Sequence, residues 1–586
     1  MASADAQVKA YHERSKHRLQ RYAAGPETLD WDAQPAPFRR WDGAPVRRLP
    51  LVADGLSASW AGVLGVTGHD APAVWPLSLQ AVSALLELSF GLTAWKQQGP
   101  DRWAVRANPS SGNLHPTEAY VMALGVAGLA DGLYHYAPYE HALVLRQPWA
   151  MPLDDATGPG VWVGLSSIQW REAWKYGERA FRYCQLDAGH ALGGLRYAAS
   201  TLGWQARLLP ALDHATLATM LGVDRDADFG KAEREEAEML IRVGPGELAE
   251  WTAESTVDAQ GSLWALQARM AAASGEWQGQ ASRLDAHPMY RWPVIDEVAR
   301  ATRAVSAGEG GGGEQTPCGM VPIDPDPDPD PDPDPVPGLG TGWRQMPPDV
   351  LPPRWGLPAA DLIRERRSAQ HFDKRAQMPA GAFFRLLDAI LPTAGLPFDA
   401  WPAAPCVHPV LFVHRVEGLT PGAYVLPRSL DGEALLRQHL QTGQDWQSVD
   451  EAPQGLPLYR LVAHPTLSGT LRTLSCHQAI ASDACFAVSL LAEFDGPVSE
   501  SPARYRTLFQ ESGLLGQVLY MQAEAEGFRG TGIGCYFDDA VHELLGLHGD
   551  GLQALYHFTV GAPIVDARIG SEPPYAGRPE VSLSDA

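Results

Sequence analysis

Hydroxyl, amide and bare backbone groups gather in one short loop within RANPSSGNLHPTEAY, the segment from Arg106 to Tyr120. The loop consists of Pro109, Ser110, Ser111, Gly112 and Asn113. Its side chains can donate hydrogen bonds to a polar ligand or accept them, and the glycine leaves backbone N–H groups accessible. PSSGN predicts a binding loop, but alone it also fits an ordinary turn. His115 can face the same ligand or cap the loop, and we favour capping.

A basic triplet stands in IRERRSAQHF, from Ile363 to Phe372. Arg366 and Arg367 offer charge and bidentate donors, and Ser368 adds a hydroxyl. Because an apolar-periodic stretch begins here, we expect a helix start, where backbone N–H groups favour a phosphate. A solvated basic turn is the alternative interpretation.

Lys175 and Tyr176 are adjacent in WREAWKYGERAFRY, from Trp170 to Tyr183. A lysine partly removed from water has a lowered pKa and can accept a proton, while a neighbouring phenol can relay or orient it. Packing at the surface is the alternative for this pair. The arginines of the segment can be structural partners of local carboxylates: Arg171, Arg179 and Arg182.

Glycines recur at alternate positions in GFRGTGIGCYFDD, from Gly527 to Asp539. Gly530, Gly532 and Gly534 let the backbone approach a planar ring, but their spacing is not the GxGxxG dinucleotide fingerprint. Cys535, within this segment, is expected to pack rather than react.

Other polar residues are interpreted as structural. Asp187 and His190 are expected to pair with each other or with Arg182. Cys476, His477 and Cys485 lack a fourth ligand at a credible spacing, so we expect no metal. Hydrolase motifs such as GxSxG and HExxH do not occur.

Composition restricts the class of protein. The 586 residues carry a net charge of −23, which disfavours nucleic acid and anionic membrane surfaces as partners. Six cysteines without a CxxC pair argue against a disulfide framework and favour a reducing compartment. No stretch has the length of a membrane span and no signal sequence is seen, so we expect a soluble, cytoplasmic protein.

The sequence repeats itself on either side of a low-complexity tract. VAGLADGLY (126–134) matches VEGLTPGAY (416–424) at an offset of 290, and a block at an offset of 324 pairs Asp187 with Glu511 and Gly189 with Gly513. The copies are predicted to share an α+β pattern. Strands are expected over 121–126 and 410–416 and up to Gly244 and Gly561, with helices ending before Gly203 and Gly527. The glycine run 308–313 and the Asp-Pro repeat 324–335 predict an extended spacer.

Together, these motifs resemble the nitroreductase superfamily of FMN enzymes, and within it the SagB-type azoline-oxidase branch. Pro109 to Tyr120, the RRS triplet and the glycine segment carry the resemblance, and YHERSKH (11–17) and WDAQPAPFRRWDGAP (31–45) are similar to the leader of that branch. The resemblance implies two tandem nitroreductase-like domains, each an antiparallel-rich sheet flanked by helices, packed as an intrachain pseudo-dimer. The expected boundaries are a leader over 1–50, domain 1 over 51–300, a linker over 301–345 and domain 2 over 346–586.

The two copies keep different halves of the implied FMN site. The first has the PSSGN loop but no basic residue between Arg48 and Lys96, whereas the second has RRS but reads DAWPAAP at 399–405. In the resembled family the flavin lies between two subunits, so these complementary losses predict one composite site and one degenerate one. The expected contacts are Pro109, Ser110, Ser111, Asn113, Arg366, Arg367, Ser368, Gly532, Ile533 and Gly534, with FMN as cofactor and no metal.

The resemblance implies an FMN-dependent oxidoreductase that oxidises azoline-like heterocycles in a peptide or small molecule. Lys175 and Tyr176 match the base and orienting pair of azoline oxidases. Two alternatives stay open: a general NAD(P)H-dependent nitro or quinone reductase, and a non-catalytic docking partner in a peptide-modifying complex.

Overall fold

A computed structural model describes residues 3–149, 158–209, 212–246, 266, 270, 275–304, 351–440, 445–578 and 581. The predicted spacer, with its glycine run and Asp-Pro repeat, lies outside these residues. Among the described helices, none is both long and apolar enough to cross a membrane.

Two seven-stranded sheets of neighbouring antiparallel strands form the scaffold. In spatial order, the first contains β2 (Val46–Arg48), β7 (Ala142–Pro148), β6 (Gly132–Ala137), β5 (Thr117–Leu124), β8 (Gly160–Ser167), β10 (Glu236–Gly244) and β9 (Gln205–Leu208). The second contains β14 (Gln447–Ser448), β15 (Tyr459–Ala463), β13 (Gly422–Val425), β12 (Val407–Val413), β16 (Phe486–Glu493), β18 (Leu552–Gly561) and β17 (Arg529–Ile533). Six strands of the two sheets correspond in spatial and chain order, whereas the edge strands β2 and β14 come from different places in the chain. The predicted α+β class with two packed, sheet-bearing domains is confirmed.

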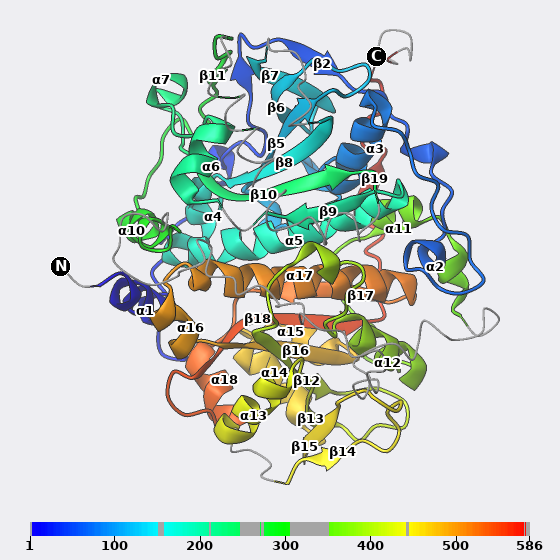
Figure 1. The fold of residues 1–586 in the computed structure, drawn as a ribbon. Helices are drawn as coiled ribbons and strands as arrows, with labels where there is room; N and C mark the ends of the chain where they lie inside the picture. Colours follow the sequence, from blue (N-terminus) through cyan, green and yellow to red (C-terminus); the bar gives the residue numbers. More distant parts are fainter. Residues whose placement is uncertain are drawn as a thin grey trace, which may run out of the picture.

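Two long helices, α5 (Ala180–Thr201) and α17 (Arg504–Ala525), lie against each other between the sheets (Figure 1). They approach closely at two glycines. A Cβ on Gly189 would stand 1.9 Å from the carbonyl oxygen of Gln510, and one on Gly513 would stand 2.1 Å from that of Leu186. Both pairings follow the same 324-residue offset, so the crossing is reciprocal between the halves.

Segments of each half extend onto the other. The C-terminal strand β19 (Gly570–Glu572) pairs with β3 (Leu92–Gln98), which pairs with β4 (Asp101–Arg106). The N-terminal helix α1 (Ala4–Arg14) packs on α16 (Asp495–Glu500) as well as on α10 (Pro293–Ala301). These exchanges fasten the two halves beyond the helix interface.

The remaining helices cover the sheets or connect strands (Figure 1). The α-helices are α2 (Trp60–Val63), α3 (Leu79–Ser89), α4 (Gln169–Tyr176), α6 (His214–Leu221), α7 (Asp226–Phe229), α11 (Ala359–Glu365), α12 (Ala380–Ala389), α13 (Leu430–His439), α14 (Leu467–Leu474), α15 (Ala479–Asp483) and α18 (Asp538–Leu545). The 3-10 turns are η1 (Trp31–Ala33), η2 (Ala53–Gly55), η3 (Ser111–Asn113), η4 (Gly177–Arg179), η7 (Pro353–Gly356) and η8 (Phe398–Ala400). A small ladder joins β1 (Trp41–Asp42) to β11 (Gln280–Ala281).

The apolar runs are explained by burial on both faces of the strands. In β5, Val121 and Ala123 join the large core around the central helices, while Met122 and Leu124 join a smaller cluster on the outer face. Successive strand residues point to opposite faces, so a strand covered on both sides reads as a continuous apolar run. The strand predictions for 121–126 and 410–416 are confirmed as β5 and β12, within four residues at their ends.

One local prediction is wrong. The triplet Arg366 to Ser368 does not begin a helix, because α11 ends at Glu365 and the next helix begins at Ala380. The arginines therefore lie at a helix C-terminus, whose dipole favours cations. An anion held there would depend on the side chains and not on helix N–H groups.

Candidate functional site

A cavity of about 420 Å³ opens where the two halves meet, and residues of both halves line it. The first half contributes the β4–β5 loop, and the second contributes the segment after α11, strand β17 and residues 563–569. The cavity brings together Pro109, Ser110, Ser111, Asn113, Tyr176, Arg366, Arg367, Ser368, Gly532, Ile533 and Gly534. Ten predicted cofactor contacts thus share one space although they come from segments more than 250 residues apart in sequence.

The PSSGN loop is fixed by its own polar groups. Gly112, Asn113 and His115 have φ values of 60°, 60° and 54°, a left-handed conformation that is uncommon outside glycine. The His115 N–H donates to Ser110 Oγ at 2.8 Å, and the Asn113 amide donates to the carbonyl oxygen of Ala104 at 2.9 Å. His115 Nε2 also lies 3.0 Å from Asn113 Oδ1. The predicted capping role of His115 agrees with these contacts.

Asp187 anchors this loop, a role that the sequence did not indicate. Both the backbone N–H and the hydroxyl of Ser111 donate to its carboxylate, at 3.1 and 3.0 Å. Burial raises the pKa of Asp187 to about 7, although the bonds from Ser110 and Ser111 oppose this shift. The expected pairing of Asp187 with Arg182 or His190 is wrong. Spacing along a helix does not reveal that a loop 76 residues away supplies the partner.

His190 and Arg182 have partners in the second half. His190 contacts Tyr556 OH and Gln517 Oε1 at 3.1 and 3.3 Å, and Arg182 pairs with Asp538 at 2.8 Å. Arg179 pairs with the same carboxylate at 3.0 Å. Arg179 and Arg182 thus have the predicted structural role, but with an acid from the other half, whereas Arg171 pairs with Glu118 of its own half.

Cations concentrate around the cavity despite the acidic composition. Among the described lining residues, five are lysine or arginine (Lys96, Arg106, Arg366, Arg367 and Arg529) and two are aspartate (Asp187 and Asp566). Burial lowers the pKa of Arg367 to about 10, and Arg366 and Arg529 add repulsion. Burial, Arg367 and Arg529 likewise lower the pKa of Lys96. Positive charges that are held together despite burial and mutual repulsion suit the binding of an anionic group.

The RRS side chains are oriented by bonds to both halves. Arg366 donates to the carbonyl oxygens of Arg106 and Ala107 at 3.1 and 3.2 Å, directly before the PSSGN loop. Arg367 donates to the carbonyl of Thr93 at 3.2 Å. Ser368 Oγ lies 2.8 Å from Tyr520 OH. The triplet therefore helps to join the halves as well as lining the cavity. Lys96 and Arg529 escaped notice because each is an isolated basic residue in a strand.

Aromatic rings of the protein pack on Gly532 of β17 and on Gly534, directly after that strand. A Cβ on Gly532 would stand 1.7 Å from Tyr556 OH, and one on Gly534 would stand 2.0 Å from the ring of Tyr183. The Gly532 N–H donates to Tyr520 OH at 3.1 Å. Glycine is required here because tyrosine side chains fill the space of its missing Cβ, and Gly532 and Gly534 still line the cavity.

Lys175 and Tyr176, at the end of α4, reach the PSSGN loop from one side. A Cβ on Gly112 would stand 2.5 Å from Tyr176 OH and 3.1 Å from Lys175 Nζ. The ammonium group lies 5.5 Å from the ring centroid of Trp31, in the N-terminal segment. Burial lowers the pKa of Lys175, and the charge of Glu172 opposes that shift. Tyr176 lines the cavity, whereas Lys175 is not among its described lining residues, and burial removes the lysine partly from water.

Glu172 is a further candidate proton-transfer residue that the sequence did not suggest. Its side chain is buried, and neither carboxyl oxygen has a hydrogen-bond partner among the described residues. Burial raises the pKa of Glu172 well above its usual range, Asp187 adds repulsion, and Lys175 opposes both. Glu172 precedes Lys175 by three residues, on the same face of α4.

Comparison with known proteins supports the fold. Residues 363–562 match the nitroreductase family. A protein of Methanocaldococcus jannaschii named as a nitroreductase is 28% identical over 137 residues, which cover 22% of this chain and 66% of that protein. A crystal structure from Anabaena variabilis, described as a nitroreductase, aligns over 95% of this chain and 99% of its own with a TM-score of 0.63 and 20% identity. The second half therefore contains a nitroreductase family domain, and a nitroreductase-like fold extends over nearly the whole chain.

Proposed function

We propose that this protein is an FMN-dependent oxidoreductase resembling SagB-type dehydrogenases, with one composite flavin site between its halves. The observation that carries the proposal is that the PSSGN loop of one half and the RRS triplet of the other line a single cavity. FMN needs a cationic end for its phosphate, polar groups for its ribityl chain and a close surface for its ring. The donor set of this cavity fits all three needs.

Specific side chains match each part of the cofactor. Lys96, Arg367 and Arg529 would hold the phosphate, because they repel one another and lack an equal number of acids in the cavity. Pro109, Ser110, Ser111 and Asn113 would hold the ribityl chain and ring edge. Arg366, Ser368, Gly532, Ile533 and Gly534 would complete the site. Bound there, FMN supplies a two-electron acceptor for a hydride.

Lys175 and Tyr176 would perform the proton chemistry beside that acceptor. A neutral lysine is required to accept a proton, and burial favours the neutral form. Tyr176, whose pKa burial raises well above its usual range, stays protonated and can donate a hydrogen bond. Lys175 would remove a ring proton from an azoline-like heterocycle in a peptide or small molecule, and bound FMN would supply the two-electron acceptor that conversion to an azole requires.

Flavin stoichiometry tests the composite site. We expect about one FMN per chain in the purified protein, measured by absorbance after release. Lys96→Ala and Arg367→Ala, which change opposite halves, should each weaken FMN binding by about tenfold or more, measured by fluorescence titration, because a charge-assisted phosphate contact contributes about 1.5–3 kcal/mol. Arg102→Ala is the matched control, since Arg102 is an exposed residue of β4 that pairs with Glu572 outside the cavity. Two flavins per chain, or none, would contradict the proposal.

Loss of the base tests the reaction class. Lys175→Met should retain FMN but oxidise a thiazoline probe about 10²–10⁴ times more slowly, the usual contribution of a general base. Tyr176→Phe should retain part of the activity. NAD(P)H-driven reduction of nitro or quinone compounds that is unchanged in Lys175→Met, with no azoline oxidation in the parent protein, would instead establish the general reductase.

A further inference from the structure

We infer that Cys476 and Cys535 form a redox-active thiol pair on the wall of the cavity, a second two-electron site that exchanges electrons with the bound flavin. The electron exchange rests on the proposed function. The reversible Cys476–Cys535 disulfide rests only on contacts within the chain and can be tested without FMN.

Tertiary structure brings the two sulfurs into contact. Cys535 directly follows Gly534 and lines the cavity, whereas Cys476 follows α14. Their Sγ atoms are 2.6 Å apart although the residues are 59 positions apart in the chain. The other described cysteines, Cys184, Cys406 and Cys485, have no cysteine partner among the described residues. The sequence predicted only packing for Cys535, because its partner lies 59 positions away in the chain.

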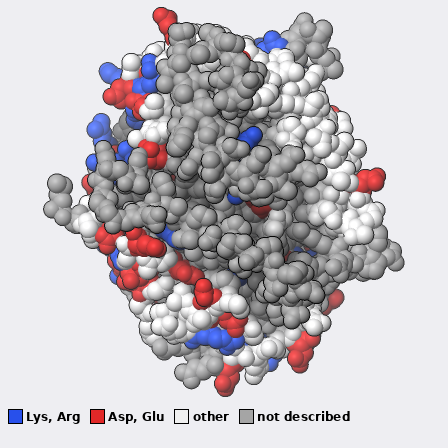
Figure 2. Space-filling view, in the orientation of Figure 1, with Lys and Arg blue, Asp and Glu red and all other residues white. Residues whose placement is uncertain are grey.

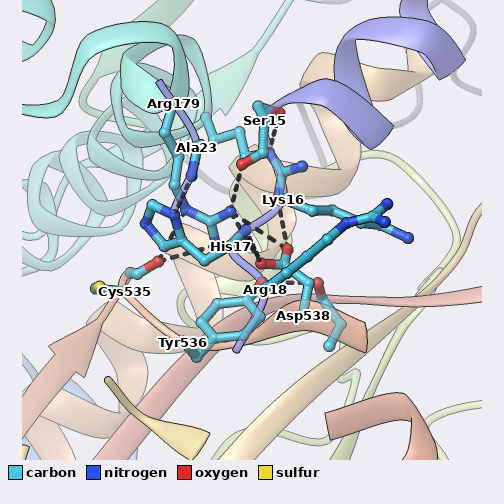
Figure 3. Close-up of polar contacts among 12 residues, drawn as sticks. Ser15, Lys16, His17, Arg18, Ala23, Arg179, Cys535, Tyr536 and Asp538 are labelled. Carbon is cyan, nitrogen blue, oxygen red and sulfur yellow. Dashed lines mark hydrogen bonds and ion pairs between the residues drawn. The ribbon is translucent and has the colours of Figure 1, made fainter. Parts of the chain in front are cut away.

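His17 of the N-terminal segment belongs to the polar cluster that is drawn with Asp538 and Cys535 (Figure 3). The backbone of His17 forms two hydrogen bonds with Asp538. Its N–H donates to the carboxylate Oδ2 at 2.9 Å, and its carbonyl accepts the Asp538 backbone N–H at 3.0 Å. Its Nδ1 accepts the backbone N–H of Ala23 at 2.9 Å, so the proton of the neutral ring lies on Nε2. His17 is among the groups that lower the pKa of Cys535. An N–H donor beside a thiol favours its thiolate.

A buried arginine adds positive charge near Cys535. Arg179 donates from Nη2 and Nε to the carbonyl of Gly534 at 3.0 and 3.2 Å, while Asp538 fixes its guanidinium. The hydrogen bond from Cys476, together with His17 and Arg179, lowers the pKa of Cys535 against the effect of burial. The bond with Cys535 and burial raise the pKa of Cys476. These surroundings favour loss of the proton from Cys535 over loss from Cys476, the asymmetry that thiol–disulfide exchange uses.

The backbone around Cys476 is also unusual. Cys476 and His477 have φ values of 52° and 63°, so two successive non-glycine residues adopt the left-handed conformation. Such residues persist where the surroundings dictate them, often at functional sites. The amide of Gln478 donates to the carbonyls of Ser475 and Cys535, at 2.9 and 3.2 Å, and ties this turn to the end of β17. The turn holds Cys476 toward Cys535.

Formation of the Cys476–Cys535 disulfide is a two-electron oxidation. The Cys535 thiolate and the Cys476 thiol form one S–S bond and release two electrons and one proton, with oxidised flavin as the electron acceptor. In the reverse direction, two electrons and one proton open the bond to the thiolate and thiol, with reduced flavin as the electron donor. In a reducing compartment such a disulfide is transient and catalytic or redox-sensing, not structural. The pair would double the electron capacity of the site.

Disulfide formation is tested first in flavin-free protein. After exposure to excess glutathione disulfide, alkylation and peptide mass mapping, we expect one intramolecular bond joining Cys476 to Cys535. Cys476→Ser and Cys535→Ser should each abolish it, whereas Cys406→Ser, a half-buried cysteine outside the pair, should not change it. Absence of the bond in the parent protein, or equal bonding among other cysteines, would overturn the inference.

Electron exchange is then measured by anaerobic reductive titration of the oxidised, FMN-loaded protein, with thiols counted at the end. We expect about four electrons and two new thiols per flavin in the parent protein, and about two electrons in Cys476→Ser. Two electrons with the disulfide intact would overturn the exchange. Failure to bind FMN would instead overturn the proposed function and the exchange with it, while the disulfide in flavin-free protein would still stand.

Discussion

Two equivalent carboxylates, one on each central helix, have opposite environments. Asp187 on α5 accepts hydrogen bonds from Ser111 and lines the open cavity. Glu511 on α17, at the 324-residue offset, pairs with Arg428 and accepts the backbone N–H of Cys406 at 3.0 Å. The same scaffold position thus serves a binding loop in one half and a buried ion pair in the other.

The loops opposite these carboxylates also have different environments in the two halves. At the position corresponding to PSSGN, η8 of the second half lies directly against β9. Its Asp399 pairs with Arg196 at 2.6 Å, an ion pair that is almost fully buried. The PSSGN loop thus lines a cavity with neutral hydroxyls, whereas the corresponding loop of the second half forms a buried ion pair with Arg196. This ion pair distinguishes the two loops in addition to the lost motif residues.

Removal of Arg428 should have the largest effect on this comparison. Arg428→Ala leaves Glu511 buried without its cation and removes the donor to the carbonyls of Ile390 and Val407, bonds of 2.7 and 2.9 Å. We expect the free energy of unfolding to fall by about 3–5 kcal/mol, measured by urea denaturation. Arg437→Ala, which breaks an exposed i,i+4 pair with Glu433, is the control and should cost under about 1 kcal/mol. Equal losses would show that burial of the Arg428 pair is unimportant.

Asp187→Asn should reveal how much stability is lost when this buried carboxylate, which has no cation partner among the described residues, becomes charged. The folded state raises this pKa from 3.8 to about 7, so it keeps a proton that the unfolded chain releases between those values. Stability from this group is therefore greatest at low pH and declines as the pH rises toward 7. Relative to Asp187→Asn, the unfolding free energy of the parent protein should fall by about 2–3 kcal/mol from pH 5 to pH 7.5. Glu511→Gln should destabilise at both pH values, and a flat difference for Asp187→Asn would contradict the raised pKa.

The smallest effect is expected at the glycines where α5 and α17 cross, and there the same substitution can be made in both halves. Gly189→Ala and Gly513→Ala each place a Cβ against a backbone carbonyl of the facing helix, so the helices must separate. We expect similar losses of about 1–3 kcal/mol in thermal or chemical unfolding. Gly194→Ala is the control, because its Cβ would meet nothing closer than 3.9 Å. A loss in only one of the two variants would show that the halves are not equivalent at the crossing.

Much of the local structure could be read from residue patterns. Apolar runs predicted β5 and β12, and apolar periodicity before Gly203 and Gly527 predicted the ends of α5 and α17, because strand and helix periods leave a local signature. The helix start at Arg366 was wrong, since charge at a helix terminus is ambiguous between its two ends without the neighbouring element. Lys96 and Asp187 were missed as cavity residues because a single polar residue in a strand or helix carries no signal of what faces it.

The sequence by itself determined the two-half organisation, the α+β elements and the polar motifs, because periodicity, repetition and residue chemistry are properties of neighbours along the chain. Only the tertiary structure decided which motifs meet. It placed the PSSGN loop against Arg366 and Arg367, brought His17 and Cys476 to Cys535, and matched Glu511 with Arg428. Such contacts join residues tens to hundreds of positions apart, and their burial and charge arise only when the helices and sheets pack.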